Sequence, residues 1–172
     1  MSKRALNKYL NDLSKEQLQD QIVDLYERFK EVKTFYDFAF NPKEDKLIED
    51  ARFKISKEYF PLNGRRPKMR RSIAQKQIKH FITLGVEPSL VIDLMLYNIE
   101  IALVFSRDKE IKQTSFYTSM LRSFEQAIEY TNAHGLFNEF KERIEQILDD
   151  VDQLDWINKE GFERALLFTF KE

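Results

Sequence analysis

Residues 88–105, PSLVIDLMLYNIEIALVF, contain the longest apolar run of the chain, Leu90 to Phe105. Pro88 is well placed to open a helix, because the missing N–H of proline is not needed in the first helical turn. Most of the circumference of such a helix would be hydrophobic, so we predict that it lies at the centre of the fold. Because Asp93, Asn98 and Glu100 interrupt the run, we expect it to be too short to span a bilayer.

Helix signals recur on both sides of this stretch. Ser14 and Gln17 match a capping box, and apolar residues from Leu18 to Ala39 then recur at alternating steps of four and three. Gly85 follows another helical pattern, at the position that favours a left-handed backbone. We predict seven or eight helices, over residues 3–12, 15–39, 41–59, 69–84, 88–105, 115–134, 136–154 and 158–170, with Asn41 and Pro42 opening the third.

No alternation of period two and no strict repeat occurs along the chain. Only four Gly and four Pro are present, which disfavours an all-β fold with frequent turns. We therefore predict an all-α fold, either an irregular antiparallel helical bundle or a short α–α superhelical stack. At 172 residues, the chain suits a single helical domain over residues 1–172.

The composition limits the class of protein. Charged residues make up 33% of the chain, too many for a membrane protein, so we expect no membrane partner. The absence of Cys excludes disulfides, thiolate catalysis and Cys-ligated zinc. The N-terminal residues MSKRALNKYL hold charges and no apolar core segment, so no secretory signal is visible and we expect a cytoplasmic protein.

The strongest electrostatic feature is the segment 63–79, NGRRPKMRRSIAQKQIK. It contains seven basic residues and no acid, although the net charge of the whole chain is only −1. Such a local positive field indicates an anion nearby. The candidate anion- or partner-binding residues are Arg65, Arg66, Lys68, Arg70, Arg71, Lys76 and Lys79.

Three interpretations of this basic segment remain open. Its arginines could pair with carboxylates of the same chain, and the candidates are Asp20, Asp24, Glu27, Glu31, Asp93 and Glu100. They could instead bind an acidic protein, or a nucleic acid or other phosphate ligand. Aromatic residues are not interleaved with the basic ones, which weakens the nucleic-acid interpretation. The leading hypothesis is a non-enzymatic interaction module that binds an acidic partner or anionic ligand through residues 65–79.

A rival hypothesis is an enzyme with a small pocket at Asp93, Tyr97 and Glu100. These residues recur at i, i+4 and i+7 on the most apolar helix, and a carboxylate with a raised pKa there could act as an acid or base. Alternatively, they form a solvent edge or an ion pair with Arg66 or Arg70.

No cofactor or metal site is indicated by the sequence. The two His residues lack the Glu-x-x-His spacing of helical di-metal sites, so the acidic stripe from Asp20 to Glu31 is interpreted as a solvated face. Aromatic residues gather near Phe29–Phe40, and we expect them to be buried beneath neighbouring helices; alternatively, an exposed patch there could serve dimerisation or partner binding. A further alternative for the whole protein is a purely structural helical scaffold or homodimer. The oligomeric state is left open.

Four segments together resemble a known family: SKRALNKYLNDLSKEQL, DLYERFKEVKTFYDFAFNPKEDKL, KEYFP and RRPKMRRSIAQKQIKHFITLGVEP, within residues 2–88. They are similar to an uncharacterised bacterial domain-of-unknown-function family. The resemblance covers the first half to two-thirds of the chain. It implies a small intracellular helical domain and transfers no activity, cofactor or site residue.

Overall fold

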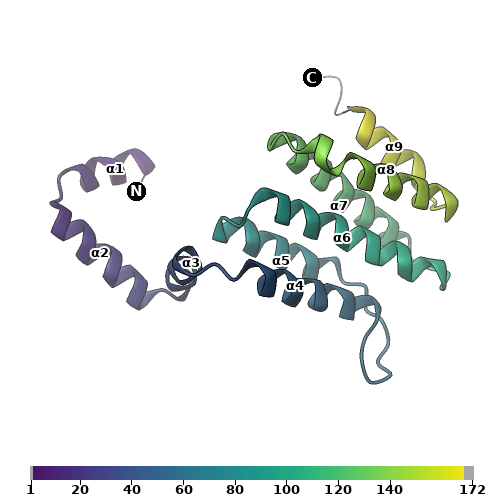
Figure 1. The fold of residues 1–172 in the computed structure, drawn as a ribbon, viewed down its shortest axis with the longest axis horizontal. Helices are drawn as coiled ribbons and strands as arrows, with labels where there is room; N and C mark the ends of the chain where they lie inside the picture. Colours follow the sequence, from purple (N-terminus) through teal and green to yellow (C-terminus); the bar gives the residue numbers. More distant parts are fainter. Residues whose placement is uncertain (1, 169–172) are drawn as a thin grey trace. The chain divides into compact units, whose positions relative to one another are not determined.

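The fold is all-α, as predicted. The computed structural model describes residues 2–168, which form nine helices and no strand. In chain order the helices are α1 (Lys3–Asn11), α2 (Lys15–Arg28), α3 (Lys30–Phe40), α4 (Glu44–Tyr59), α5 (Arg71–Leu84), α6 (Pro88–Arg107), α7 (Thr114–Ala133), α8 (Phe137–Gln153) and α9 (Lys159–Phe168) (Figure 1).

The chain divides into two compact units. The first unit, Met1–Lys43, contains α1 to α3, and the second unit, Glu44–Glu172, contains α4 to α9. The prediction of a single domain over residues 1–172 stays a prediction.

The predicted helix over residues 15–39 is wrong at Phe29. This residue adopts an extended backbone (φ −119°, ψ 115°), so α2 ends one residue before it and α3 begins one residue after it. The turn brings α3 against α2, where the Tyr26 hydroxyl donates a hydrogen bond to Asp37 Oδ1 at 2.8 Å. A single extended residue leaves the spacing of the apolar stripe intact, so periodicity did not reveal the break.

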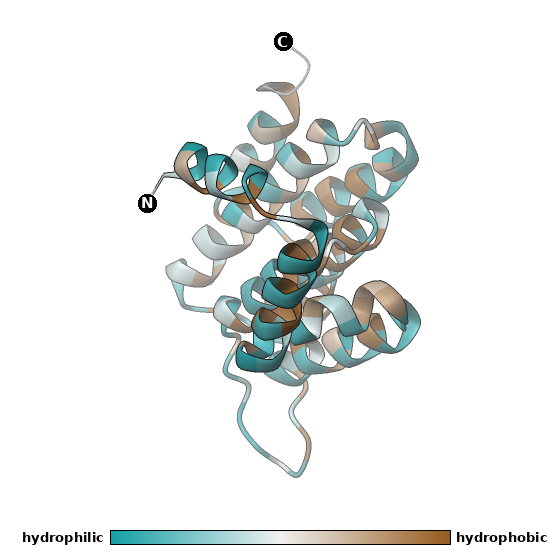
Figure 2. Ribbon diagram, turned by 90° about the vertical axis from the view of Figure 1, so that its left-hand side faces the viewer, coloured by the Kyte–Doolittle hydropathy of each residue, from teal (hydrophilic) through white to brown (hydrophobic). Residues whose placement is uncertain are grey.

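The capping box predicted at the start of α2 is confirmed. Ser14 Oγ accepts a hydrogen bond from the Gln17 N–H at 3.2 Å, and Gln17 Oε1 accepts one from the Ser14 N–H at 2.8 Å. Yet no side chain described in α1, α2 or α3 is buried. Phe29 is 49% exposed and Phe40 is 84% exposed. The first unit is therefore helical without a core of its own, and Figure 2 shows hydrophobic residues along these exposed helices.

The predicted start of the next helix at Asn41 and Pro42 is also wrong. The Asn41 N–H instead donates to the Asp37 carbonyl at the end of α3. α4 begins only at Glu44, and its first turn holds Glu44 and Asp45. Carboxylates in a first turn are favoured by the helix dipole, which explains the later start.

The second unit is a stack of helices in two layers. α4, α6 and α8 lie side by side in one layer, while α5, α7 and α9 lie behind them in the view of Figure 1. Each helix packs on the next one along the chain. Of the two arrangements that the sequence left open, the α–α stack describes this unit.

α6 lies at the centre of the stack, as its composition predicts. It packs on α4, α5, α7 and α8. Its buried side chains are Val91, Ile92, Leu94, Met95, Leu96, Asn98, Ile99, Ala102, Leu103 and Phe105.

The sequence predicted that this run is too short to span a bilayer. Judged by length and composition alone, that prediction is wrong. α6 extends to Arg107, and its 20 residues make it the one helix within residues 2–168 that meets both criteria for a membrane span. However, 56% of its most apolar stretch is buried inside the protein, as in the core helix of a soluble protein.

The remaining helix boundaries agree with the prediction to within two residues. Gly85 has the predicted left-handed backbone, with φ 71°. The last helix was predicted to reach residue 170, and residues 169 and 170 lie outside the part of the chain that the structure describes.

Candidate functional site

The predicted basic segment begins in the connection between α4 and α5, residues 60–70, which we call the basic loop. The loop stands out from the helices of the second unit (Figures 1 and 2). At its tip, Asn63 and Gly64 have positive φ angles of 59° and 66°. Gly adopts this backbone freely, and Asn tolerates it better than most residues. The tight turn places Arg65 and Arg66 directly after the tip.

One residue of α4 holds the returning half of the basic loop. The Glu58 carbonyl accepts hydrogen bonds from the N–H groups of Lys68 and Met69 at 2.9 and 3.0 Å. The Glu58 carboxylate accepts three more from Arg70: from its backbone N–H at 3.2 Å, from Nε at 2.9 Å and from an Nη at 2.8 Å. Because Glu58 is buried, these bonds fix the loop against the helix.

The pairing also sets the charge of Glu58 and Arg70. Hydrogen bonds from Arg70 lower the pKa of the Glu58 carboxyl; burial opposes this effect, and the charge of Lys68 adds to it. The hydrogen bond to Glu58 in turn raises the pKa of the Arg70 guanidinium. Both groups are therefore ionised, and one of the seven predicted cations is neutralised inside the molecule.

Glu58 was not among the carboxylates proposed from the sequence as partners for the basic segment. A signal was present, because an acid in the last turn of a helix works against the helix dipole and needs another reason to be there. Glu58 is also the last acid before the acid-free stretch that ends at Glu87.

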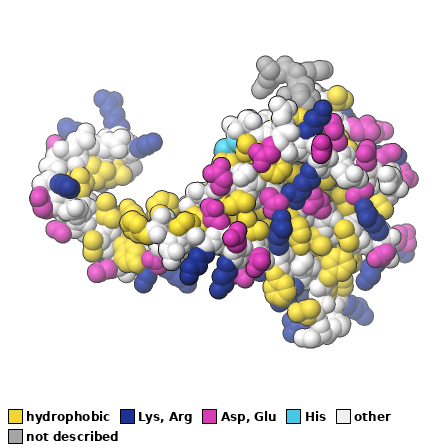
Figure 3. All heavy atoms as spheres, in the orientation of Figure 1, with side chains coloured by type: hydrophobic (Ala, Val, Ile, Leu, Met, Phe, Trp, Pro, Cys, Tyr) yellow, Lys and Arg dark blue, Asp and Glu magenta, His cyan; other side chains and the backbone are white. Residues whose placement is uncertain are grey.

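Three other cations of the loop remain exposed around a hollow of about 290 Å³. Arg65, Arg66 and Lys68 line it together with Lys57 from the last turn of α4. Within residues 2–168 none of these four side chains forms an ion pair. Figure 3 shows Lys and Arg side chains beside hydrophobic ones around the loop. Lys57 was not predicted, because it belongs to a helix of mixed charge.

The helical part of the basic segment has a different arrangement. Arg71 reaches from α5 to α7, where its Nε donates to Ser123 Oγ at 3.2 Å and an Nη donates to Gln126 Oε1 at 2.9 Å. Gln75 Nε2 donates to the same Gln126 oxygen at 3.1 Å. Burial, followed by the charge of Arg122, lowers the pKa of the Arg71 guanidinium. Arg71 thus joins two helices through neutral partners.

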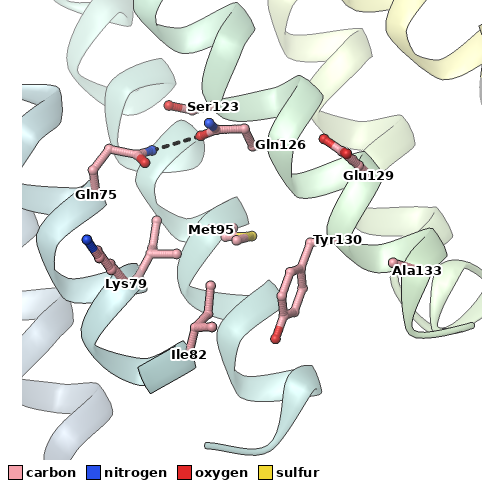
Figure 4. Close-up of a pocket in the computed structure, with 10 residues that line it drawn as sticks. Gln75, Lys79, Ile82, Met95, Ser123, Gln126, Glu129, Tyr130 and Ala133 are labelled. Atoms are coloured by element: carbon pink, nitrogen blue, oxygen red, sulfur yellow. Dashed lines mark hydrogen bonds between the residues drawn. The ribbon is translucent and has the colours of Figure 1, made fainter. Parts of the chain in front are cut away.

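Beyond this bridge, α5 and α7 border a groove of about 450 Å³ whose floor is α6, and we call it the α5–α7 groove (Figure 4). Lys79 lines its α5 side and Glu129 its α7 side, while Met95 contributes to the floor. Lys76 is exposed and lines neither this groove nor the hollow of the loop. The seven predicted residues therefore do not form one continuous site.

The polar residues of α6 are engaged in a cluster of ion pairs. Arg143 of α8 donates both to Glu100, with one Nη bond of 2.8 Å, and to Asp93 Oδ1 at 2.7 Å. Arg52 of α4 donates to Asp93 at 2.6 Å, and its guanidinium lies 5.2 Å from the centre of the Tyr97 ring. An ion pair with Arg66 or Arg70 was one of the alternatives for this stripe; the stripe does form ion pairs, but with Arg52 and Arg143.

This cluster connects three helices of one layer. Burial lowers the pKa of the Arg143 guanidinium, but hydrogen bonds to Glu100 and Asp93 oppose burial, and the net change is a raised pKa. Arg143 bonds to both carboxylates and Arg52 bonds to Asp93 as well, so both acids of this stripe already have internal partners. The geometry favours a structural ion-pair cluster over the catalytic pocket of the rival hypothesis.

Within residues 2–168, no group of three or more His, Asp or Glu side chains is placed to hold a metal ion. His134 lies at the end of α7, where its Nδ1 is 2.8 Å from the Tyr130 carbonyl. Neither observation points to metal chemistry.

Comparison with known proteins identifies a family. Residues 1–170 match a family described as "Family of unknown function (DUF6155)". The match extends well beyond the segments that carried the resemblance in the sequence. No curated protein matches the chain, and no solved structure matches it. Because the match covers nearly the whole length of the chain, the chain belongs to this family of unknown function.

Proposed function

We propose that this protein is a non-enzymatic interaction module whose basic loop binds an acidic segment of a partner protein. One observation carries the proposal. Glu58 neutralises Arg70 and fixes the returning half of the loop, while Arg65, Arg66 and Lys68 stay exposed around the hollow. The internal carboxylate is thus used to position the loop and not to neutralise its remaining cations.

Fixing the loop favours binding. A loop that is already ordered loses less conformational freedom when a partner binds, so more of the interaction energy contributes to affinity. The planar guanidinium groups of Arg65 and Arg66 are suited to bidentate contacts with carboxylates. Among the described residues, Glu58 is the one carboxylate that lines the hollow, and it is already paired.

The surroundings of the loop favour a protein over a nucleic acid. Phe60 is 43% exposed and Leu62 is 54% exposed, so apolar surface lies beside the cations. Protein interfaces combine apolar contacts with charged ones, whereas a nucleic-acid backbone offers chiefly phosphates. The net charge of −1 also differs from that of a typical nucleic-acid-binding domain, which is basic overall.

A cytoplasmic location is part of the proposal. It is supported by a sequence without Cys, since proteins of oxidising compartments often depend on disulfides.

The test measures binding of defined probes to the full chain by fluorescence anisotropy. The probes are a peptide of alternating Glu and Leu, the same peptide with Gln for Glu, and a single-stranded oligonucleotide of equal charge. We expect the Glu peptide to bind best, and to bind more weakly at about 200 mM than at about 50 mM salt, because exposed charges are screened.

The key variant carries Arg65→Ala, Arg66→Ala and Lys68→Ala, and leaves Arg70 in place because Arg70 holds the loop. We expect it to bind the Glu peptide about tenfold more weakly, or worse. A control with Lys46→Ala, Arg122→Ala and Lys141→Ala removes three exposed cations from other helices of the same unit. Equal binding by the two triple variants, or a preference for the oligonucleotide, would overturn the proposal.

A further inference from the structure

In the layer formed by α5, α7 and α9, α7 packs closely against α9 on one side but not against α5 on the other. On the α9 side, Gly161 lets α9 approach α7 so nearly that a Cβ atom there would lie 2.6 Å from a Leu121 methyl carbon. α5 and α7 make no comparable helix–helix contact. They are joined by the polar bridge from Arg71 and Gln75 to Gln126. The α5–α7 groove is the space that this opening leaves above α6.

The groove has an apolar interior. Ile78 and Ile82 of α5, Met95 of α6 and Tyr130 of α7 line it, and Ile82 is 45% exposed. Figure 4 shows Ile82, Met95 and Tyr130 between the ribbons of the helices that border the groove. The stretch of α5 that lines it corresponds to about two helical turns, or roughly 10 Å.

The two sides of the groove carry opposite charges. Lys79 lies on the α5 side and Glu129 on the α7 side, and Figure 4 shows them apart on either side of the apolar residues. Neither side chain forms an ion pair with any residue in the described part of the chain. A partner could therefore satisfy one charge on each side.

From this arrangement we infer that the α5–α7 groove binds one amphipathic helix of a partner protein. The helix places an apolar stripe, with residues at i, i+4 and i+7, against Ile82 and Tyr130, above the nearly buried Ile78 and Met95. Recognition of a helix in a groove uses this spacing, and the two-turn length of the groove matches it. The helix carries an acidic residue toward Lys79 and a basic residue toward Glu129. The inference does not depend on the basic loop.

The charges add specificity to the apolar contact. A helix that is acidic on both flanks would bring like charges together at Glu129, and a helix that is basic on both flanks would do so at Lys79. A helix with one flank of each sign is the complementary occupant. At the end of the groove where the polar bridge joins α5 to α7, the polar side chains already bond to one another. Few of them are left to form hydrogen bonds with a small molecule.

The experiment selects binders to the full chain from a display library of helical peptides of about 15 residues, a length at which isolated helices begin to form. The library has a fixed apolar stripe and random flanking positions. We expect enriched peptides to carry an acidic flank and a basic flank. Their affinity should fall about tenfold or more with Ile82→Glu, which places a charge in the apolar interior.

Ile157→Glu is the matched control, because Ile157 is a 67% exposed isoleucine of the same unit outside the groove. If Ile82→Glu does not fold, Lys79→Glu is used in its place. Both sides of the groove are then acidic, so the peptides selected for binding to this variant should be basic on both flanks. Three outcomes would overturn the inference. The selection could enrich no peptide, the enriched peptides could bind Ile82→Glu and Ile157→Glu equally well, or free phenylalanine could occupy the groove while no peptide does.

Discussion

The two units of this chain use similar amphipathic helices but differ in what those helices bury. In the first unit, none of the side chains described in α1 to α3 is buried. In the second unit, Phe81, Leu94 and Phe124 are completely buried, and so are many other large side chains. An apolar stripe is therefore enough to specify a helix, but burial also requires neighbouring helices that cover the stripe.

The difference has an energetic consequence. Most of the stability of a helix in a protein comes from packing of its apolar face and not from intrinsic propensity. We therefore expect the second unit to dominate cooperative unfolding, and the first unit to open at a lower free energy. The following substitutions test this contrast.

The largest effect is expected from Phe81→Ala in α5. Phe81 has no exposed surface, so the substitution leaves a cavity and should lower the free energy of unfolding by about 3–5 kcal/mol. Phe35→Ala in α3 is the matched control, because Phe35 is 42% exposed. Its effect should be about 0.5 kcal/mol or less. Urea denaturation followed by circular dichroism measures both, and similar losses would refute the contrast between the units.

A smaller effect is expected from Glu58→Gln, which removes a buried carboxylate that anchors the basic loop. The variant keeps the shape of the side chain but weakens its hydrogen bonds to Arg70, so it should cost about 1–3 kcal/mol at neutral pH. Glu16→Gln is the control in the first unit, where the carboxylate is exposed at the start of α2. It should leave the unfolding transition of the second unit unchanged.

The cost of Glu58→Gln should depend on pH. Pairing with Arg70 lowers the pKa of Glu58 in the folded state below its value of about 4.3 in an unfolded chain. The stabilisation is therefore complete above about pH 4.3 and is lost as the pH falls through the folded-state pKa. The stability gap between wild type and variant should accordingly narrow in acid. A gap that stays constant down to low pH would show that the ion pair is not its source.

Local sequence signals predicted most of the fold because they act through neighbouring residues. The capping box at Ser14, the left-handed Gly85 and the apolar circumference of α6 each predicted a feature that the structure contains. The break at Phe29 escaped prediction because an extended residue there does not change the apolar spacing. The two-layer order was also beyond reach, because it depends on contacts between helices far apart in sequence.

The candidate site was only partly predictable for the same reason. Charge along the chain located the basic segment, but not which of its cations find partners. Arg70 pairs with a carboxylate that precedes the segment, and Arg71 pairs with neutral groups more than 50 residues away. Likewise, nothing near Asp93 in the sequence indicated that Arg143 would join it.

The smallest effect on the main unfolding transition is expected from Ser14→Ala, which also tests whether the chain is a single domain. The substitution removes the capping box of α2, a change that costs a helix about 0.5–2 kcal/mol. If the first unit opens separately, this loss should reduce helical circular dichroism at low temperature without shifting the melting temperature of the second unit. A melting temperature lowered in step with the lost helicity would instead mean that both units unfold together. In that case the apolar stripes of α1 to α3 must be covered in solution, and the two units would not differ in what their helices bury.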